Sequence, residues 1–196
     1  MDKTRTKPNV DEAIIGAVEV LRKGGIILYP TDTVWGVGCD ATNQEAVDKI
    51  YALKRSVDKK SMIVLCNTLD MTVRYISRPP QIALDVMEVS DKPLTAIMPG
   101  GVGVAPNLIP EEGTLAIRVP EHDACKEIIR RLGKPLVSTS ANISGEATPL
   151  RLSEISAEIV EGVDFIVPPR LEGKPTRQPS SIIKFELDNT FKIIRE

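Results

Sequence analysis

Short apolar runs alternate with helix-like segments along most of this chain, and this alternation limits the fold more than any other feature. The first helical segment begins near Asp11, carries an apolar stripe and ends at Gly24-Gly25. Further helical segments are expected at 42–53, 69–75, 81–89, 123–132 and 153–160. Strand-like runs are expected at 26–29, 34–38, 62–65, 94–98, 115–119, 136–139 and 165–167. The pattern predicts an α/β fold.

The last part of the chain adds a hairpin to this pattern. Residues 182–185 and 191–194 are apolar runs joined by Leu187-Asp188-Asn189-Thr190. A terminal hairpin makes the sheet mixed, so we expect an open, twisted mixed sheet with flanking helices. The Gly- and Pro-rich segment 100–110 is short enough to be a surface loop. We therefore expect residues 1–196 to form one domain.

The charge balance and the N-terminal residues restrict the kind of protein. The 25 Lys and Arg residues nearly match the 27 Asp and Glu residues, which argues against a surface that tracks nucleic acid throughout. A local basic pocket remains compatible with this balance. Residues 1–10 are polar, and no run of about 18 apolar residues occurs, so we expect a cytoplasmic protein without a membrane span.

The cysteines and the histidine argue against several kinds of active site. Cys39, Cys66 and Cys125 are far apart and lie in apolar or mixed sequence, which predicts reduced thiols in the core. The chain has a single histidine, His122, which excludes a multi-histidine zinc site. Because His122 directly precedes a predicted helix, a capping role suits it better than catalysis.

Lys54 stands at the end of an apolar helical stripe. The stripe contains Val47, Ile50 and Tyr51, and Lys54 is four residues after Ile50. Position alone favours a lysine that extends to solvent or stabilises the C-terminus of the helix. The alternative is an inward-facing cation beside a cavity that holds an anion.

Two further segments could bind a ligand. Residues 138–145, Ser-Thr-Ser-Ala-Asn-Ile-Ser-Gly, follow a strand and could either hydrogen-bond a ligand or simply form a turn. Residues 36–41 fit the G-x-G-x-x-A pattern of dinucleotide-binding enzymes, which keeps a nucleotide-dependent oxidoreductase as an alternative. The polar turn precedes these glycines, however, which is the wrong order for that motif.

Several short motifs lie between residues 24 and 195. They are Gly24-Gly25, 29–38 (Tyr-Pro-Thr-Asp-Thr-Val-Trp-Gly-Val-Gly), Lys54, Pro93-Leu94-Thr95, 118–122 (Arg-Val-Pro-Glu-His), 138–145 and 179–183 (Pro-Ser-Ser-Ile-Ile). None is specific alone, but their order and spacing are specific. Taken together, they resemble the YrdC-like threonylcarbamoyl-AMP synthase family.

The resemblance implies a sheet around a basic cavity and a particular reaction. L-threonine takes up bicarbonate or carbon dioxide, and the resulting carbamate attacks the α-phosphate of the substrate ATP with loss of pyrophosphate. The product would serve threonylcarbamoyladenosine modification of tRNA, through tRNA or a tRNA-modifying protein complex. Mg²⁺ bridging the phosphates is compatible with this chemistry, but no acidic cluster points to it, and we assign no metal ligands.

The resemblance also implies roles for individual residues. Active-site roles fall to Lys54, Ser140 and Asn142. Contacts to threonine fall to Thr33, Arg118, Ser138 and Ser180. Contacts to ATP fall to Lys54, Lys60, Thr114, Ser140, Thr148 and Arg195.

One position departs from the family pattern. The family has K-x-R where this chain has Lys54-Arg55-Ser56. Arg55 comes one residue early, which turns its side chain by about 100° on a helix, so Lys60 is the better substitute. Ser56 therefore favours, weakly, a YciO-like paralogue that binds RNA or nucleotide without synthase activity, whereas the Ser140-Ala141-Asn142 motif favours the synthase.

Overall fold

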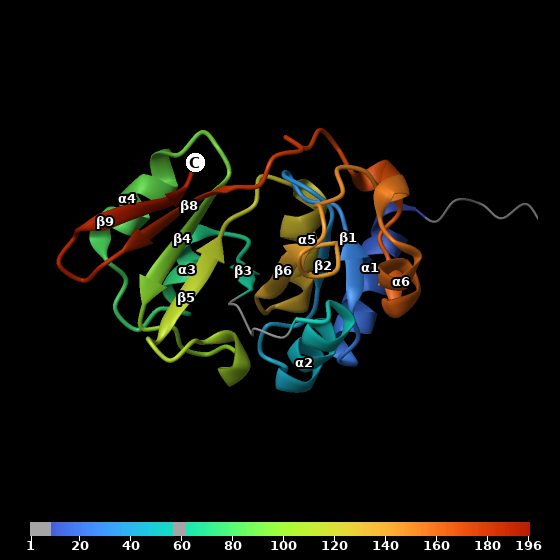
Figure 1. The fold of residues 1–196 in the computed structure, drawn as a ribbon, viewed down its shortest axis with the longest axis horizontal. Helices are drawn as coiled ribbons and strands as arrows, with labels where there is room; N and C mark the ends of the chain where they lie inside the picture. Colours follow the sequence, from blue (N-terminus) through green and yellow to red (C-terminus); the bar gives the residue numbers. More distant parts are fainter. Residues whose placement is uncertain (1–8, 57–61) are drawn as a thin grey trace, which may run out of the picture.

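A nine-stranded mixed sheet with flanking helices forms the centre of the protein, as Figure 1 shows. The computed structural model describes residues 9–56 and 62–196. Within them the strand order is β7-β1-β2-β6-β3-β5-β4-β8-β9. The strands are β1 (Ile27–Tyr29), β2 (Gly36–Gly38), β3 (Ile63–Leu65), β4 (Leu94–Pro99), β5 (Thr114–Arg118), β6 (Leu136–Ser140), β7 (Phe165–Ile166), β8 (Ser181–Phe185) and β9 (Phe191–Arg195). The predicted α/β fold with a mixed sheet is confirmed.

Helices cover the sheet, and most begin at a side chain that caps them. They are α1 (Val10–Arg22), α2 (Gln44–Leu53), α3 (Leu69–Val73), α4 (Gln81–Val89), α5 (Asp123–Leu132) and α6 (Ala157–Gly162), with short 3₁₀ turns η1 (Pro106–Leu108), η2 (Leu152–Glu154) and η3 (Pro169–Leu171). Asn43 caps α2 by accepting from the Ala46 N–H, and Gly133, with φ 74°, ends α5. Helix α1 packs against α5, and α3 packs against α4.

One helix differs from the sequence prediction. A continuous helix was expected at 153–160, but the structure has the 3₁₀ turn η2 followed by the separate helix α6. Ile155 and Ser156 are extended, with ψ of 131° and 147°, and the Ser156 hydroxyl accepts from the Ile159 N–H. The serine acts as an N-cap, and a cap residue is non-helical by nature, so it separates the two segments.

The chain crosses the sheet once near its C-terminal end. Residues 167–180, called the strap below, run from β7 at one edge to β8 near the other, over the top of the molecule in Figure 1. The Val167 N–H donates to the Leu28 carbonyl at 2.9 Å, and further along the Thr176 N–H donates to the Asp32 carbonyl at 2.8 Å. The strap is thereby fixed to β1 and to the turn that joins β1 and β2.

The buried hydrophobic residues form one continuous core, which contains the three cysteines. Cys39, Cys66 and Cys125 are free and buried, as predicted. Burial raises the pKa of the Cys66 thiol to about 12, so the thiol stays protonated and unreactive at neutral pH. No helix in residues 9–56 and 62–196 has the length and apolar character needed to cross a bilayer.

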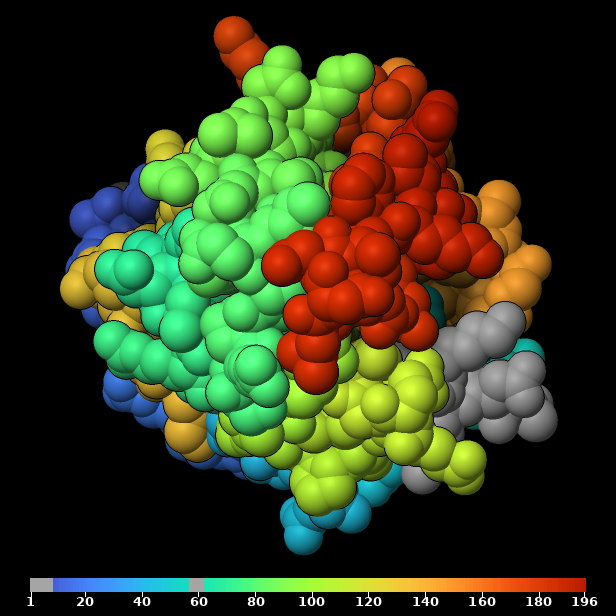
Figure 2. Space-filling model, turned by 90° about the vertical axis from the view of Figure 1, so that its left-hand side faces the viewer, coloured from blue at the N-terminus to red at the C-terminus, as the bar shows by residue number. Residues whose placement is uncertain are grey.

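The hairpin β8–β9 forms one edge of the sheet. Figure 2 shows it on the surface in red, between the green segment around residues 70–95 and the yellow-green segment around residues 100–113. All residues of β9 are exposed. The pairing shifts by one residue between Ile182 and Ile183, because Ile183 pairs with Ile193 whereas Ile182 pairs with Arg195. This bulge leaves Ile194 without a direct partner on β8.

Candidate active site

A cavity of about 250 Å³ opens where the ends of β5 and β6 meet the turn between β1 and β2. It contains most of the residues for which the sequence predicted substrate contacts. They are Thr33, Arg118, Ser138, Ser140, Thr148, Ser180 and Arg195. The other lining residues are Val34, Met62, Ile63, Thr139, Pro179 and Ile182. Two of these described lining residues are arginines and none is acidic, so the cavity favours anionic ligands.

Arg118, the last residue of β5, is 3% exposed and pairs with a carboxylate. Its Nη2 atom lies 3.1 Å from Oδ1 of Asp32, and Nη1 donates to Oδ2 at 3.5 Å. Nη2 also donates to the Thr33 hydroxyl at 3.4 Å. The buried Nε has no hydrogen-bond partner among the described residues. The guanidinium is therefore fixed along one edge and keeps a donor for a ligand.

The threonines of the turn form a directed chain of hydrogen bonds. The Thr31 hydroxyl donates to the Val34 carbonyl at 2.7 Å and lies 2.9 Å from the Thr33 hydroxyl. A hydroxyl has one proton to donate, so the proton between the two hydroxyls must come from Thr33. The Thr33 oxygen consequently offers only lone pairs to Arg118 and to the cavity.

Lys54 points inward and holds the loop that follows β6. Its ammonium donates to the Ser140 carbonyl at 2.5 Å and to the Asn142 carbonyl at 2.6 Å. The side chain is 6% exposed, so the interpretation of Lys54 as a solvent-directed lysine is wrong. Burial lowers the pKa of Lys54 to about 8. Lys54 is not among the residues that line the cavity; it lies behind them and sets the position of Ser140.

Asn142 also serves the geometry of this loop. Its Nδ2 donates to the carbonyls of Ile143 and Glu146, both at 2.9 Å. Its Oδ1 is buried and has no partner among the described residues. Asn142 is not a lining residue in this arrangement, but it carries an acceptor with an unmet hydrogen-bonding capacity.

Arg55 and Ser56, which replace the family's x-R after Lys54, have partners outside the cavity. Arg55 pairs with Glu158 of α6 at 2.7 Å, and both side chains are exposed. The Ser56 hydroxyl lies 2.5 Å from the Ser144 hydroxyl. Neither side chain lines the cavity, in agreement with the expectation that Arg55 does not replace the missing arginine. Lys60 lies outside the described residues.

The far wall of the cavity comes from the C-terminal hairpin. The Ser180 hydroxyl lies 2.8 Å from the hydroxyl of Thr95, which is fully buried in β4. Arg195 donates from Nε at 3.0 Å and from Nη2 at 2.7 Å to the Ser180 carbonyl. Burial lowers the pKa of Arg195, which nonetheless stays charged because its ordinary value is far above neutrality.

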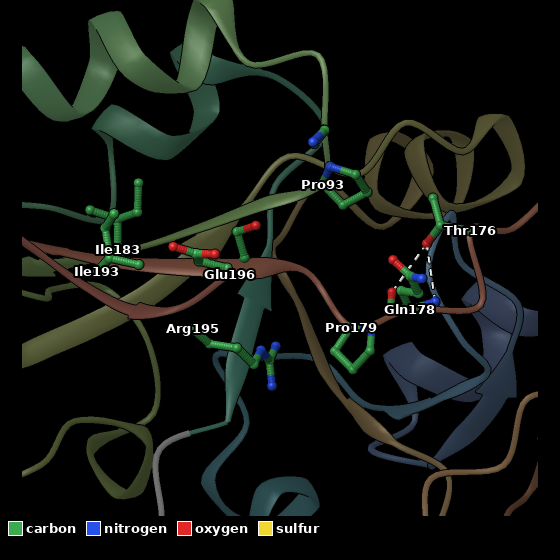
Figure 3. Close-up of a pocket in the computed structure, with 10 residues that line it drawn as sticks. Pro93, Thr176, Gln178, Pro179, Ile183, Ile193, Arg195 and Glu196 are labelled. Carbon is green, nitrogen blue, oxygen red and sulfur yellow. Dashed lines mark hydrogen bonds between the residues drawn. The ribbon is translucent and has the colours of Figure 1, made fainter.

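The bulge in β9 determines which face Arg195 occupies. Paired residues share a face, so Arg195 lies with Ile182, which lines the cavity, and opposite Ile183. In Figure 3 Arg195 leaves the hairpin on the side away from Ile183. A second hollow of about 690 Å³ shares Arg195 and Pro179 with the cavity. Figure 3 shows the residues that line this hollow.

The predictions for Thr114 and His122 have different outcomes. Thr114 begins β5, and its hydroxyl is 3.5 Å from a Glu112 oxygen; it does not line the cavity. His122 caps α5, as predicted, by accepting from the Cys125 N–H at its Nδ1. Its other nitrogen is 3.1 Å from the Glu172 carbonyl, so both ring nitrogens have structural partners.

The glycine pattern at 36–41 serves the sheet rather than a dinucleotide. Gly36 and Gly38 lie inside β2, whereas the dinucleotide motif needs its glycines at a turn that leads into a helix. A Cβ on Gly38 would come within 2.1 Å of the Val137 carbonyl oxygen and 2.8 Å of the Tyr29 ring. The glycine is required by this close approach, and the oxidoreductase interpretation loses its support.

Two residues beside the cavity received no role from the sequence, although both lie in its matched motifs. Asp32 pairs with Arg118, and Thr95 contacts Ser180. The sequence held a signal for each. Asp32 is a carboxylate in a turn beside an apolar strand, and Thr95 is a hydroxyl between the apolar Leu94 and Ala96. A polar group buried in such a place needs a hydrogen-bond or ion-pair partner. The sequence does not say which partners they find.

Comparisons with known proteins show the family of this chain. The family model for Sua5, YciO and YrdC proteins, described as telomere recombination, matches residues 19–196. The chain belongs to the Sua5/YciO/YrdC family. One family relative, the threonylcarbamoyl-AMP synthase of Pseudoalteromonas translucida (strain TAC 125), is 34% identical over 172 residues, which cover 86% of this chain and 91% of the relative.

Solved structures of two members of the Sua5/YciO/YrdC family share the fold. E. coli YciO superposes with a TM-score of 0.82 at 27% identity and covers 97% of this chain and 91% of its own. P. abyssi Sua5 complexed with L-threonine superposes with a TM-score of 0.81 at 22% identity, over 92% of this chain and 52% of that one. The two scores are nearly equal, so the fold alone does not separate Sua5 from YciO.

Proposed function

We propose that the protein catalyses the formation of threonylcarbamoyl-AMP from L-threonine, bicarbonate and ATP. The carrying observation is the cavity, which brings two guanidinium groups and a row of hydroxyls together with no carboxylate among its described lining residues. Adenylyl transfer onto a carboxylate needs two anions held together and needs the charge of the departing pyrophosphate neutralised. The relative with 34% identity carries the name of this activity.

The proposed reaction balances without a protein nucleophile. The threonine amine attacks bicarbonate, and water leaves as the carbamate forms. A carbamate oxygen then attacks the α-phosphorus of ATP, the bond to the β-phosphate oxygen breaks, and pyrophosphate departs. The protein contributes position and charge, which are the main sources of catalysis in such a transfer.

The cavity residues divide between the two substrates by their chemistry. We assign the threonine carboxylate to Arg118, whose guanidinium matches a carboxylate, with Thr33, Ser138 and Ser180 around the rest of the amino acid. For ATP, we assign its phosphates to Arg195, which no carboxylate neutralises in the described structure.

Of the other residues predicted to contact ATP, some line the cavity and some do not. Ser140 and Thr148 line it, whereas Lys54 acts from behind through the loop. Asn142 belongs to the same supported loop. Thr114 would need a different arrangement of the segment before β5 to reach a nucleotide here, since it lies at the start of the strand that Arg118 ends.

A Mg²⁺ ion would be held mainly by the nucleotide. The described lining residues offer hydroxyl oxygens but no carboxylate, and no group of three or more metal-ligating side chains occurs in the described part of the chain. Mg²⁺ commonly binds through substrate phosphates and water with few protein ligands. When bound, the ion would neutralise phosphate charge beside the hydroxyls of Ser140 and Thr148.

We further propose that the product passes to a tRNA-modifying protein complex, or to tRNA itself, in the cytoplasm. Threonylcarbamoyl-AMP is a mixed anhydride, which transfers its acyl group readily to an amine. The exocyclic amine of adenosine in tRNA is such an acceptor. This part of the proposal rests on the family.

The decisive experiment is pyrophosphate release from ATP, measured with and without L-threonine and bicarbonate. The synthase requires both for release above background. A thermal-denaturation series accompanies it, in which ATP raises the melting temperature and threonine adds to the increase by mass action. Pyrophosphate release that does not depend on threonine would reject the proposal.

The alternative is a YciO-like binding protein, which the serine at position 56 favours. Such a protein would bind ATP or RNA without releasing pyrophosphate. The same assay separates the two candidates, and binding of a labelled tRNA measured at several salt concentrations reports phosphate contacts.

A further inference from the structure

A buried carboxylate stands behind the proposed threonine site and has no part in the reaction as described. Asp32 is 7% exposed and Arg118 is 3% exposed, so their ion pair lies almost completely out of water. Removing two charges from water is costly, and a buried pair is weak evidence for added stability. A role in positioning would explain why a carboxylate is held here.

Asp32 is fixed from three directions. Its Oδ2 accepts Nη1 of Arg118 at 3.5 Å and the Glu121 N–H at 3.2 Å, and its Oδ1 lies 3.1 Å from Nη2 of Arg118 in an ion pair. Its carbonyl accepts the Thr176 N–H of the strap at 2.8 Å. The turn, the residues after β5 and the strap therefore all meet at Asp32. A carboxylate held in this way can fix the orientation of the guanidinium that it contacts.

The donors of Arg118 show which edge remains. Asp32 faces the edge formed by Nη1 and Nη2, with a hydrogen bond at Nη1 and an ion-pair contact at Nη2, while Nε, on the adjacent edge, is buried and has no hydrogen-bond partner among the described residues. Nη2 also donates to the Thr33 hydroxyl at 3.4 Å, which is a weak hydrogen bond beside the Nε–Nη2 edge. A carboxylate binds an arginine best through two parallel N–H donors, and the Nε–Nη2 edge supplies such a pair.

We propose that Asp32 is a positioning residue that presents the Nε–Nη2 edge of Arg118 to the carboxylate of the amino-acid substrate. The inference rests on the proposed function, in which Arg118 binds threonine. Because Asp32 already compensates the charge of Arg118, recognition at this edge depends on directed hydrogen bonds more than on net charge. The site therefore selects a carboxylate over other anions, and phosphates gain more at Arg195.

The test measures binding of L-threonine and of ATP separately, by isothermal titration calorimetry, to the wild type and to Asp32→Asn. The asparagine keeps the shape and one acceptor but loses the charge that orients the guanidinium. We expect threonine binding to weaken about tenfold or more and ATP binding to change less than about twofold. In wild type, binding of threonine without pyrophosphate release would reject the proposed reaction but leave this comparison intact.

Asp40→Asn is the matched control. Asp40 is also buried, at 4% exposed, and is paired with Lys134 at 2.7 Å, but it does not line the cavity. This variant should bind both ligands like the wild type. If Asp32→Asn does not fold, Asp32→Glu replaces it, since the longer side chain keeps the charge but displaces the guanidinium and should weaken threonine binding similarly.

Three outcomes overturn the inference. Equal losses of threonine and ATP binding in Asp32→Asn would mean general damage to the cavity. Tighter threonine binding would mean that Asp32 competes with the substrate for Arg118. Wild-type protein that does not bind threonine at all would remove the ligand on which the inference depends.

Discussion

The two walls of the cavity are built differently, although each presents an arginine. Arg118 ends a central strand, is almost fully buried and is paired with the carboxylate of Asp32. Arg195 belongs to the exposed edge strand β9 and donates to the main-chain carbonyl of Ser180. The central wall is preorganised and compensated in charge, which suits a small ligand of fixed shape. The edge wall keeps a full positive charge, which suits phosphates.

The largest expected effect comes from breaking the central wall. Arg118→Met should lower the free energy of unfolding by about 3 to 5 kcal/mol, because it leaves Asp32 buried without its cation. Urea denaturation of the purified variant measures this change. A loss below about 1 kcal/mol would mean that the pair is open to water, and the contrast between the walls would disappear.

The loop behind the central wall should matter for rate rather than for folding. Lys54→Met keeps the apolar stem but removes both hydrogen bonds to the loop, and should cost about 2 to 4 kcal/mol of transition-state stabilisation. This corresponds to a fall of about thirty-fold to a thousand-fold in threonine-dependent pyrophosphate release. Lys49→Met is the control. Lys49 lies on the same helix as Lys54 and also donates to a main-chain carbonyl, that of Gly24, but it does so away from the cavity. Wild-type rates in Lys54→Met would exclude this role.

The lowered pKa of Lys54 makes the central wall sensitive to pH. Because its pKa is about 8, Lys54 loses its proton as the pH rises through 8, and the rate should fall about tenfold between pH 7 and pH 9. Unfolding does not explain such a fall. Between pH 8 and the ordinary pKa of lysine, Lys54 is more often protonated in the unfolded chain than in the folded protein. The contribution of Lys54 to the free energy of unfolding therefore rises with pH in this range. The measurement is a pH–rate profile with melting temperatures recorded at each pH, and a flat profile would contradict the expectation.

The smallest effect is expected at the edge wall. Arg195→Met should change the free energy of unfolding by no more than about 0.5 kcal/mol, since the residue is only partly buried on an exposed edge strand and its removal leaves no buried charge behind. ATP binding should weaken about fivefold, whereas threonine binding should be unchanged. Calorimetric titration with both ligands checks this difference. A larger loss for threonine than for ATP would reverse the assignment of the two walls.

Local sequence patterns were sufficient for most of the elements, whereas the set of polar residues at the cavity came from the resemblance to the family. The apolar stripe ending at Lys54 and the small-residue loop after β6 were both recognisable, because helix and strand periodicities and cap residues act locally. The pairing of Asp32 with Arg118 was not recognisable. The two are 86 positions apart, and their contact depends on how the turn and the strand end meet in space.

The register of the edge strand shows the same limit. Nothing in the run Phe191 to Arg195 marks Ile194 as the bulged residue, because all positions there are compatible with a regular strand. Without the bulge, Arg195 would face the other side of the hairpin. The face on which Arg195 lies is therefore set by the pairing of β9 with β8 and by the hydrogen bonds to the Ser180 carbonyl.

The position of the strap has a consequence for the way the protein is made. During translation the segments of the central wall emerge first, but Ser180 and Arg195 reach the sheet only after the strap has crossed it. The pairings of β1 with β7 and of β4 with β8 join residues far apart in the chain, and such contacts form late. A nascent or clipped chain would thus lack the edge wall altogether. Binding of nucleotide would report that the whole sheet has been completed.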